Sequence, residues 1–282
     1  MPVNPLISYV GRRFRCDTTP VWEDGVELCQ SGGRTGVLLL HAVYGSPWEM
    51  HAIAHYLAAL GCTVHVPRLR GHASVPDALF GIRAWDWVED ARRAFSTLAA
   101  RTDRQFVIGQ CLGGRVGLAL CLRHDLHVAG LVTIGTAFKP LPDQRFLPRP
   151  LAWLPFGWQP TSIPGPGGLD FAGVTRQPIR VHALTPWRCY QAYRPSSVPA
   201  LGRPLRRFVS DNLPRFEDPV MFVHASDDHL YDQGHARFAY ERVGSRDKSV
   251  YIVDSVTHIL ATNERKLPVL LRRLGAFIRA RT

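Results

Sequence analysis

The sequence predicts an α/β fold, in which helices cover both faces of a mostly parallel β-sheet. Short apolar runs bounded by glycine and turn-forming residues alternate with longer segments whose apolar residues recur at helical spacing. This alternation is typical of βαβ units with strands buried on both faces. The chain has 282 residues, 46% of them hydrophobic, and can therefore fold around a full core without disulfides or metal.

The first three strands alternate with two helices. The run GVLLLH is too short for a helix and is bounded by glycine, so a buried strand is expected there. In the first helix, Pro47 suits the first turn and Gly61 suits the end. The second helix has acidic residues in its early turns, which the helix dipole favours. The strands are expected at 36–41, 62–67 and 105–110, and the helices at 47–61 and 83–101.

The same alternation continues to the C-terminus with one interruption. A helix and a strand precede the interruption, and strand, helix, strand and helix follow it. The strands are expected at 127–135, 219–226 and 249–254, and the helices at 113–124, 234–243 and 263–281.

The interruption, residues 137–216, predicts a cap or lid inserted into the core domain of residues 1–136 and 217–282. It holds 14 of the 22 prolines, and a structureless loop of this length is uncommon in a compact domain. A short helix is expected at 203–213. The segment is rich in aromatic residues, which form either the core of the cap itself or the wall of an apolar substrate pocket. The candidate pocket residues are Trp153, Trp158 and Trp187.

The net charge of +11 is concentrated in this segment. The whole chain has 34 Lys and Arg against 23 Asp and Glu, and only three of the cations are lysines. Residues 138–216 carry eleven of the cations and three aspartates. A GC-rich coding sequence explains an arginine bias but not this concentration. A basic cap can receive an acidic acyl carrier protein or a coenzyme A thioester. No nucleic-acid-binding motif is present, so no nucleic-acid partner is expected.

The remaining composition indicates a cytoplasmic protein. The six cysteines are scattered without the spacing of a metal site or disulfide framework, which is typical of reduced thiols. The N-terminus lacks a basic stretch followed by an apolar one, so no signal peptide is expected. No apolar run reaches the length of a membrane-spanning helix.

The strand at 105–110 leads through Gly109-Gln110-Cys111-Leu112-Gly113 into a helix, and this is the context of a nucleophile elbow. The turn is so tight that side chains at 109 and 113 would collide with the neighbouring strand and helix. Cys111 is thereby exposed at the end of the strand, where the start of the helix favours a thiolate. A buried structural cysteine is the alternative interpretation.

An acid and a histidine follow later strands, in the chain order that such a site requires. Asp227 and Asp228 come just after strand 219–226, and His258 comes just after strand 249–254. Since the carboxyl ends of parallel strands share one edge of the sheet, these side chains can meet Cys111 there.

These segments resemble the α/β-hydrolase superfamily, in particular bacterial carboxylesterases and monoacylglycerol lipases. The resemblance is carried by VLLLHAVYGSPWEM, FVIGQCLGG, PVMFVHASDDHLY and VTHILATN. It implies the α/β-hydrolase fold with an inserted cap, a small or lipid-like acyl substrate, and no cofactor or metal. It also implies a triad of Cys111, His258 and Asp228, and an oxyanion hole formed by the backbone N–H groups of Val43 and Leu112.

Two departures from the family pattern affect the expected chemistry. The family has serine at position 111 and glycine at position 42, where this chain has Cys111 and Ala42, and Gln110 is also unusual. A cysteine nucleophile suits acyl hydrolysis through a thioester, and it suits acyl transfer to an amine, alcohol or thiol at least as well. A catalytically inactive binding protein of the same fold is the third alternative.

Overall fold

The computed structural model describes residues 25–43, 45–73, 82–139, 158–160, 193–195, 197–228 and 230–282. Its main feature is a seven-stranded sheet with the order β1-β3-β2-β4-β5-β8-β9. All neighbouring strands are parallel except β1, which runs antiparallel to β3. The strands are β1 (Leu28–Gln30), β2 (Thr35–Leu40), β3 (Thr63–Val66), β4 (Arg104–Gln110), β5 (Gly130–Ile134), β8 (Val220–Ala225) and β9 (Lys248–Val253).

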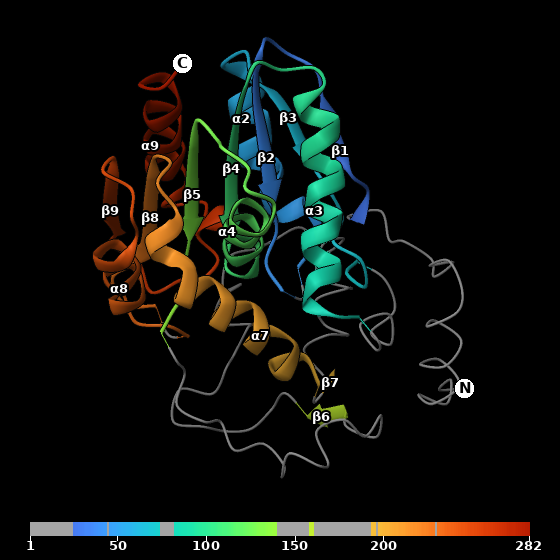
Figure 1. The fold of residues 1–282 in the computed structure, drawn as a ribbon, viewed down its shortest axis with the longest axis vertical. Helices are drawn as coiled ribbons and strands as arrows, with labels where there is room; N and C mark the ends of the chain where they lie inside the picture. The colour runs from blue at the N-terminus through green and yellow to red at the C-terminus, as the bar shows by residue number, and fades with distance from the viewer. Residues whose placement is uncertain are drawn as a thin grey trace.

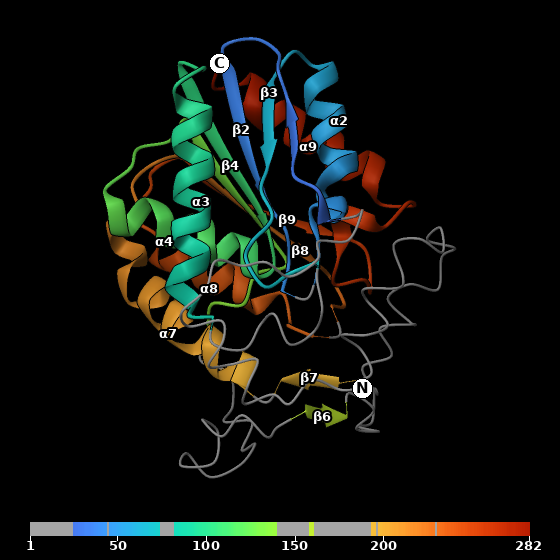
Figure 2. The same cartoon turned by 90° about the vertical axis from the view of Figure 1, so that its right-hand side faces the viewer.

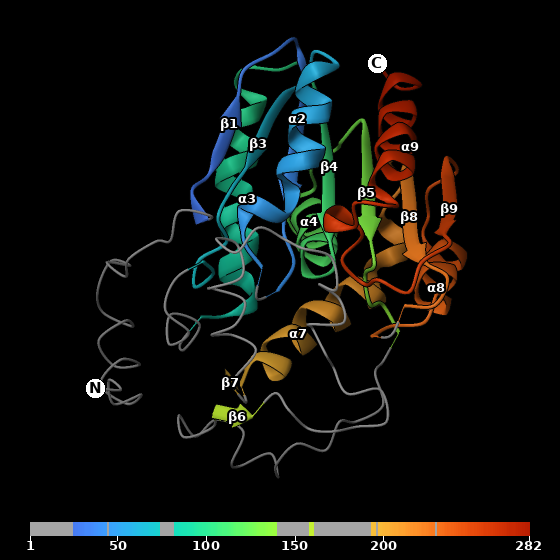
Figure 3. The ribbon, with the colours of Figure 1, turned by 180° about the vertical axis from the view of Figure 1, so that it is seen from behind.

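Helices cover both faces of this sheet, as predicted (Figure 2). One face is covered by α3 (Ala84–Ala99), α4 (Leu112–His124) and α8 (Gly234–Arg242). The other face is covered by α2 (His51–Ala59) and α9 (Leu267–Arg279), which Figure 3 shows from behind. The helix α7 (Ser197–Asn212) lies across the carboxyl ends of the strands, below the arrowheads in Figure 1.

The buried side chains form two apolar layers, one on each face of the sheet. On β2, Leu38 and Leu40 point into the layer beneath α3 and α4, whereas Val37 and Leu39 point into the layer beneath α2 and α9. All four side chains are buried, which explains why this strand is a continuous apolar run rather than an alternating one.

Several predicted boundaries differ from the structure. The helix expected at 47–61 begins with a 3-10 turn (Pro47–Met50) before α2. The last helix begins at Leu267 rather than 263, because the Asn263 side chain accepts hydrogen bonds from the backbone N–H groups of Arg265 and Lys266 and forms a turn there. Residues 127–129 precede β5 instead of belonging to it.

Three short strands and two 3-10 turns were not predicted. The edge strand β1 is only three residues long, and β6 (Trp158–Pro160) pairs with β7 (Tyr193–Pro195) in a separate small sheet. Two further 3-10 turns lie at Leu213–Arg215 and Leu260–Thr262.

Much of the expected cap lies outside the described residues, including Trp153 and Trp187. Of Trp158, the structure describes the backbone in β6. The short helix expected at 203–213 belongs to the longer helix α7, which includes Pro204. Within the described ranges, no helix combines the length and apolar character needed to cross a membrane.

Candidate active site

Cys111 occupies a sharp turn between β4 and α4, where its side chain is buried and not exposed as the elbow pattern predicts. Its φ angle of 52° is in a region that side chains rarely adopt, and strain of this kind is typical of functional sites. The two flanking glycines make the turn possible. A Cβ atom at Gly109 would overlap the backbone of the first turn of α4, and a Cβ at Gly113 would overlap the carbonyl oxygen of Leu40.

Two backbone N–H groups lie near this turn. Leu40 pairs with Gly109 across β2 and β4, so the residues that follow each strand emerge side by side. Val43 follows the first of these strands. Leu112 is the first residue of α4, and an N–H at that position has no acceptor within its own helix.

Ala42 stands where the family pattern has glycine, and its backbone conformation does not require glycine. It is not among the described non-glycine residues with positive φ. Its backbone N–H donates to Oε2 of the buried Glu49 at 2.9 Å, which anchors the loop after β2. Gly45 N–H donates back to the Ala42 carbonyl at 3.2 Å.

Asp228 follows β8 and is held in place by several hydrogen bonds. Its Oδ1 accepts the backbone N–H groups of Leu230 (2.8 Å) and Tyr231 (3.2 Å), and its Oδ2 lies 2.7 Å from Nδ1 of His258. Burial raises the pKa of this carboxyl, but the hydrogen bonds and charge of His258 outweigh burial and lower it overall. Asp227, the other acid considered from the sequence, instead accepts a hydrogen bond from the Ser226 hydroxyl.

His258 follows β9 and faces both of the other residues. Since the Asp228 carboxylate can only accept, Nδ1 carries the proton of the 2.7 Å hydrogen bond. Nε2 lies on the side of the ring that faces away from Asp228. Nε2 is buried and makes no well-formed hydrogen bond to the described residues. Burial lowers the pKa of His258, but interactions with the Cys111 thiol and with Asp228 together raise it to about 10.

A second histidine, which the sequence did not single out, also contacts Asp228. Nε2 of His224 donates to the Tyr231 carbonyl at 2.7 Å and lies 3.4 Å from Oδ2 of Asp228. Burial lowers the pKa of His224. A neutral ring with its proton on Nε2 therefore lies against the Asp228 carboxylate. The sequence signal that could have identified this residue is a histidine inside an otherwise apolar strand.

The buried Gln110 connects the elbow to the histidine loop. Its Nε2 donates to the carbonyls of Ile134 (3.2 Å) and His258 (3.1 Å), and its Oε1 accepts the backbone N–H of Ala261 (3.4 Å). Gln110 is unusual at this position, and the structure explains it by three hydrogen bonds of its side chain.

Other titratable groups near the strands have structural roles. Nε2 of His41 accepts the backbone N–H of Leu69 (3.2 Å), which places the ring proton on Nδ1, facing the Ala42 carbonyl at 2.9 Å. Among the remaining described thiols, Cys62 and Cys121 are buried and Cys29 is exposed. Burial raises the pKa of Cys62 and Cys121, and partial burial together with the charge of Glu27 raises the pKa of Cys29.

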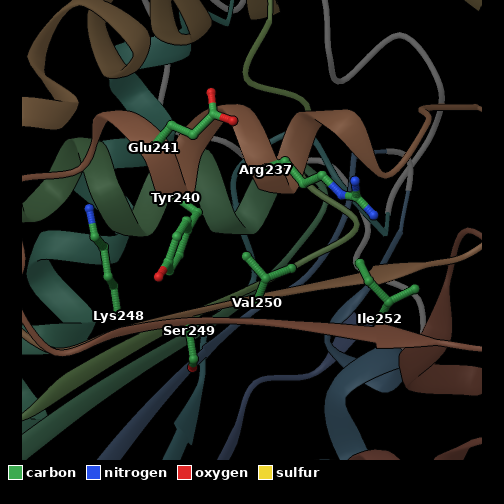
Figure 4. Close-up of a pocket in the computed structure, with 7 residues that line it drawn as sticks. All are labelled: Arg237, Tyr240, Glu241, Lys248, Ser249, Val250 and Ile252. Atoms are coloured by element: carbon green, nitrogen blue, oxygen red, sulfur yellow. The ribbon is translucent and has the colours of Figure 1, made fainter.

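A pocket with a volume of about 630 Å³ lies elsewhere, between α8 and the edge strand β9 (Figure 4). Its walls include Tyr240 and Lys248, and the side chains of Cys111, Asp228 and His258 do not line it. It is therefore separate from the site built around the elbow.

Comparisons with known proteins agree with this architecture. The family model described as "Serine aminopeptidase, S33" matches residues 33–266. A thermostable monoacylglycerol lipase of Bacillus sp. (strain H-257) is 26% identical over 254 residues, which is 90% of this chain and 94% of that protein. A pimeloyl-[acyl-carrier protein] methyl ester esterase of Aromatoleum aromaticum is 36% identical over 119 residues, 42% of this chain and 44% of that protein.

Solved structures show the same fold. One of the metagenome-derived lipolytic enzymes LipS and LipT superimposes with a TM-score of 0.76 at 26% identity, covering 93% of this chain and all of that one. A monoacylglycerol lipase of Paleococcus ferrophilus gives a TM-score of 0.72 at 13% identity, with coverage of 91% and 99%. The predicted α/β-hydrolase fold is confirmed. Because the family model covers most of its length, the chain belongs to the serine aminopeptidase, S33, family of α/β-hydrolases.

Proposed function

We propose that the protein is an acyl hydrolase that cleaves esters or thioesters with a Cys111–His258–Asp228 triad through a covalent acyl-thioester intermediate. The observation that carries the proposal is the 2.7 Å hydrogen bond from His258 to Asp228, together with the raised pKa of His258 beside the thiol. A charged imidazole next to a cysteine favours the thiolate, which is the nucleophilic form.

The first half of the reaction forms the thioester. The Cys111 thiolate attacks the carbonyl carbon, a C–S bond forms, and the carbonyl electron pair moves to the oxygen. The backbone N–H groups of Val43 and Leu112 stabilise this oxyanion. The oxyanion then collapses, the bond to the leaving group breaks, and His258 donates its proton to the departing alcohol or thiol.

The second half of the reaction releases the acid. His258, now neutral, accepts a proton from water while the water oxygen attacks the thioester carbon. A second oxyanion forms in the same place and collapses, the C–S bond breaks, and the thiolate is restored beside the imidazolium. Asp228 holds the imidazole in the required tautomer during both halves.

Similarity to ester-cleaving proteins supports the substrate class. The relatives are described as a monoacylglycerol lipase, a methyl ester esterase and a carboxylesterase. A lipid-like or other small acyl ester is therefore the proposed substrate. We also propose that residues 137–216 form the cap of the core domain, with an acidic acyl carrier protein or coenzyme A thioester as a candidate donor for its eleven cations.

Acyl transfer is the second candidate, and the cysteine at position 111 favours it. An acyl thioester reacts more readily with amines and thiols than an oxygen ester does, so an acceptor other than water can capture the acyl group. The two candidates share the first half-reaction and differ only in the acceptor.

The test is mass spectrometry of the protein after brief incubation with para-nitrophenyl esters of short and medium acyl chains. We expect one acyl group on the peptide that contains Cys111, and no such adduct in the Cys111→Ala and His258→Ala variants. The exposed Cys29 is the internal control for unspecific acylation. Absence of an adduct in the wild-type protein across the series would contradict the proposal and favour an inactive binding protein.

A second measurement separates hydrolysis from transfer. Acylated protein is mixed with water alone or with an added amine, alcohol or thiol, and the products are quantified. Free acid as the main product at modest acceptor concentrations supports a hydrolase. Capture of most of the acyl group by an acceptor would instead identify a transferase.

A further inference from the structure

Arg115 is a buried cation without a counter-charge among the described residues. It lies on α4, four residues after Cys111, and only 5% of it is exposed. Its Nε atom is fully buried and has no hydrogen-bond partner within the described ranges. No ion pair joins it to a carboxylate of the described residues. An unpaired guanidinium is unfavourable in a protein interior, so a role other than stability is indicated.

A second arginine lies close to the first, on the neighbouring helix. The Nη1 atom of Arg115 reaches α7 at Gly202, where it lies 3.6 Å from the place that a Cβ atom would take. Arg206 is four residues further along α7 and therefore on the same side of that helix. Burial, and then the charge of Arg115, lower the pKa of the half-buried Arg206. Two like charges are thus held near each other.

Tyr231 connects this arginine pair to the candidate triad. Its ring contacts the ring of His258 edge to face, with centroids 5.3 Å apart. Burial and the Cys111 charge raise the pKa of its hydroxyl, while the charges of Arg115 and Arg206 act to lower it. The phenol therefore lies within electrostatic reach of both the thiol and the two guanidinium groups.

We propose that Arg115 and Arg206 form an anion-binding subsite beside Cys111, so that the preferred substrates are esters or thioesters carrying a carboxylate or phosphate group. This inference rests on the proposed function and specifies its substrate class. Guanidinium groups bind both anions through charge-assisted hydrogen bonds. The substrate anion supplies the counter-charge that the described residues do not provide there, while the reacting carbonyl lies at the elbow.

The anion can belong to the acyl chain or to the leaving group, and paired substrates distinguish these sources. The first pair is para-nitrophenyl adipate, with a free terminal carboxylate, and its neutral methyl ester. The second pair is oleoyl lysophosphatidate and the neutral monooleoylglycerol. The measured quantity is the ratio of kcat/KM for the anionic member to that for the neutral member of each pair.

We expect the wild-type protein to favour the anionic member of at least one pair, and Arg115→Gln and Arg206→Gln each to lower that ratio by about tenfold or more. The kcat/KM for the neutral member of each pair should fall by less than that for the anionic member. Arg207→Gln is the matched control, because Arg207 is exposed and lies 3.5 Å from Asp211 as an ion pair. An anionic preference that persists unchanged in both glutamine variants, or no preference in either pair, would overturn the inference.

A binding measurement tests the anion-binding subsite independently of the proposed catalytic function. Thermal unfolding is followed with and without adipate or inorganic phosphate, which need no nucleophile. We expect a rise in Tm for wild type, Arg207→Gln and Cys111→Ala, and none for Arg115→Gln and Arg206→Gln. Acylation of Cys111 by neutral esters without any Tm shift refutes the subsite alone. A Tm shift without acylation supports the subsite and contradicts the proposed catalysis.

Discussion

The amide of Gln110 is the clearest link between the elbow and the loop that carries His258, and its removal is the most informative perturbation. Replacement by methionine keeps nearly the same volume and removes all three hydrogen bonds. The carbonyls of Ile134 and His258 each retain another donor, Cys111 N–H at 2.7 Å and Leu260 N–H at 3.2 Å. The loss therefore falls mainly on the Ala261 N–H, whose hydrogen bond to Gln110 is long at 3.4 Å.

These contacts set the expected magnitude. Buried hydrogen bonds contribute about 0.5–1.5 kcal/mol each, so with two carbonyls still partly satisfied, Gln110→Met should lower the free energy of unfolding by about 1–3 kcal/mol. We expect kcat to fall by more than this modest change in the free energy of unfolding suggests. A small displacement of a catalytic group lowers rates by about tenfold to a hundredfold, and the His258 loop loses its tether to β4.

The assay combines urea unfolding with the kinetics of para-nitrophenyl ester cleavage. Gln105→Met is the matched control, because Gln105 lies at the start of the same strand and donates only to Thr102, at 2.8 Å to its carbonyl and 3.1 Å to its hydroxyl. We expect both variants to lose stability and only Gln110→Met to lose kcat. Equal kcat losses in the two variants, or wild-type kcat in Gln110→Met, would refute the reasoning.

Three further predictions concern the same site. Asp228→Asn should slow acylation of Cys111 by about a hundredfold or more, because an amide donor no longer holds the required imidazole tautomer; stopped-flow release of nitrophenol measures this. Gly113→Ala should prevent folding or destabilise the protein strongly, whereas Gly202→Ala, where a Cβ has room, should not; thermal unfolding compares them. The raised pKa of His258 keeps its positive charge at pH 7, where an ordinary thiol is only about 3% ionised. Alkylation by iodoacetamide at that pH should therefore be faster in wild type than in His258→Ala, by at most about 30-fold, and the difference should vanish toward pH 10, where an ordinary thiol is itself ionised.

The fold could be predicted because its central strands are buried on both faces and helices such as α3 are amphipathic. The continuous apolar run of β2 and the helical spacing in α3 are local signals that need no knowledge of distant residues. Short elements such as β1 carry too few residues for a pattern. The start of α9 depends on a side-chain hydrogen bond of Asn263, which an apolar pattern does not reveal.

The candidate site was predictable only where chain order and strand ends define it. Cys111, Asp228 and His258 each follow a strand, and parallel strands bring such positions together. The roles of Gln110 and His224 were not predictable in this way. Each depends on contacts with residues far away in the sequence or on the hydrogen bonding of one ring nitrogen, and neither leaves a periodic signal.

The distance along the chain between the elbow and its histidine governs when the proposed triad can first form. Strands β2, β3 and β4 pair within residues 35–110, so this half of the sheet can assemble while the remainder is still being synthesised. His258 arrives only when β9 pairs with β8, and its contact with Gln110 spans 148 residues. Such long-range contacts form late in folding. A nascent chain therefore carries Cys111 without its proposed histidine partner, and the proposed triad is complete only in the finished molecule.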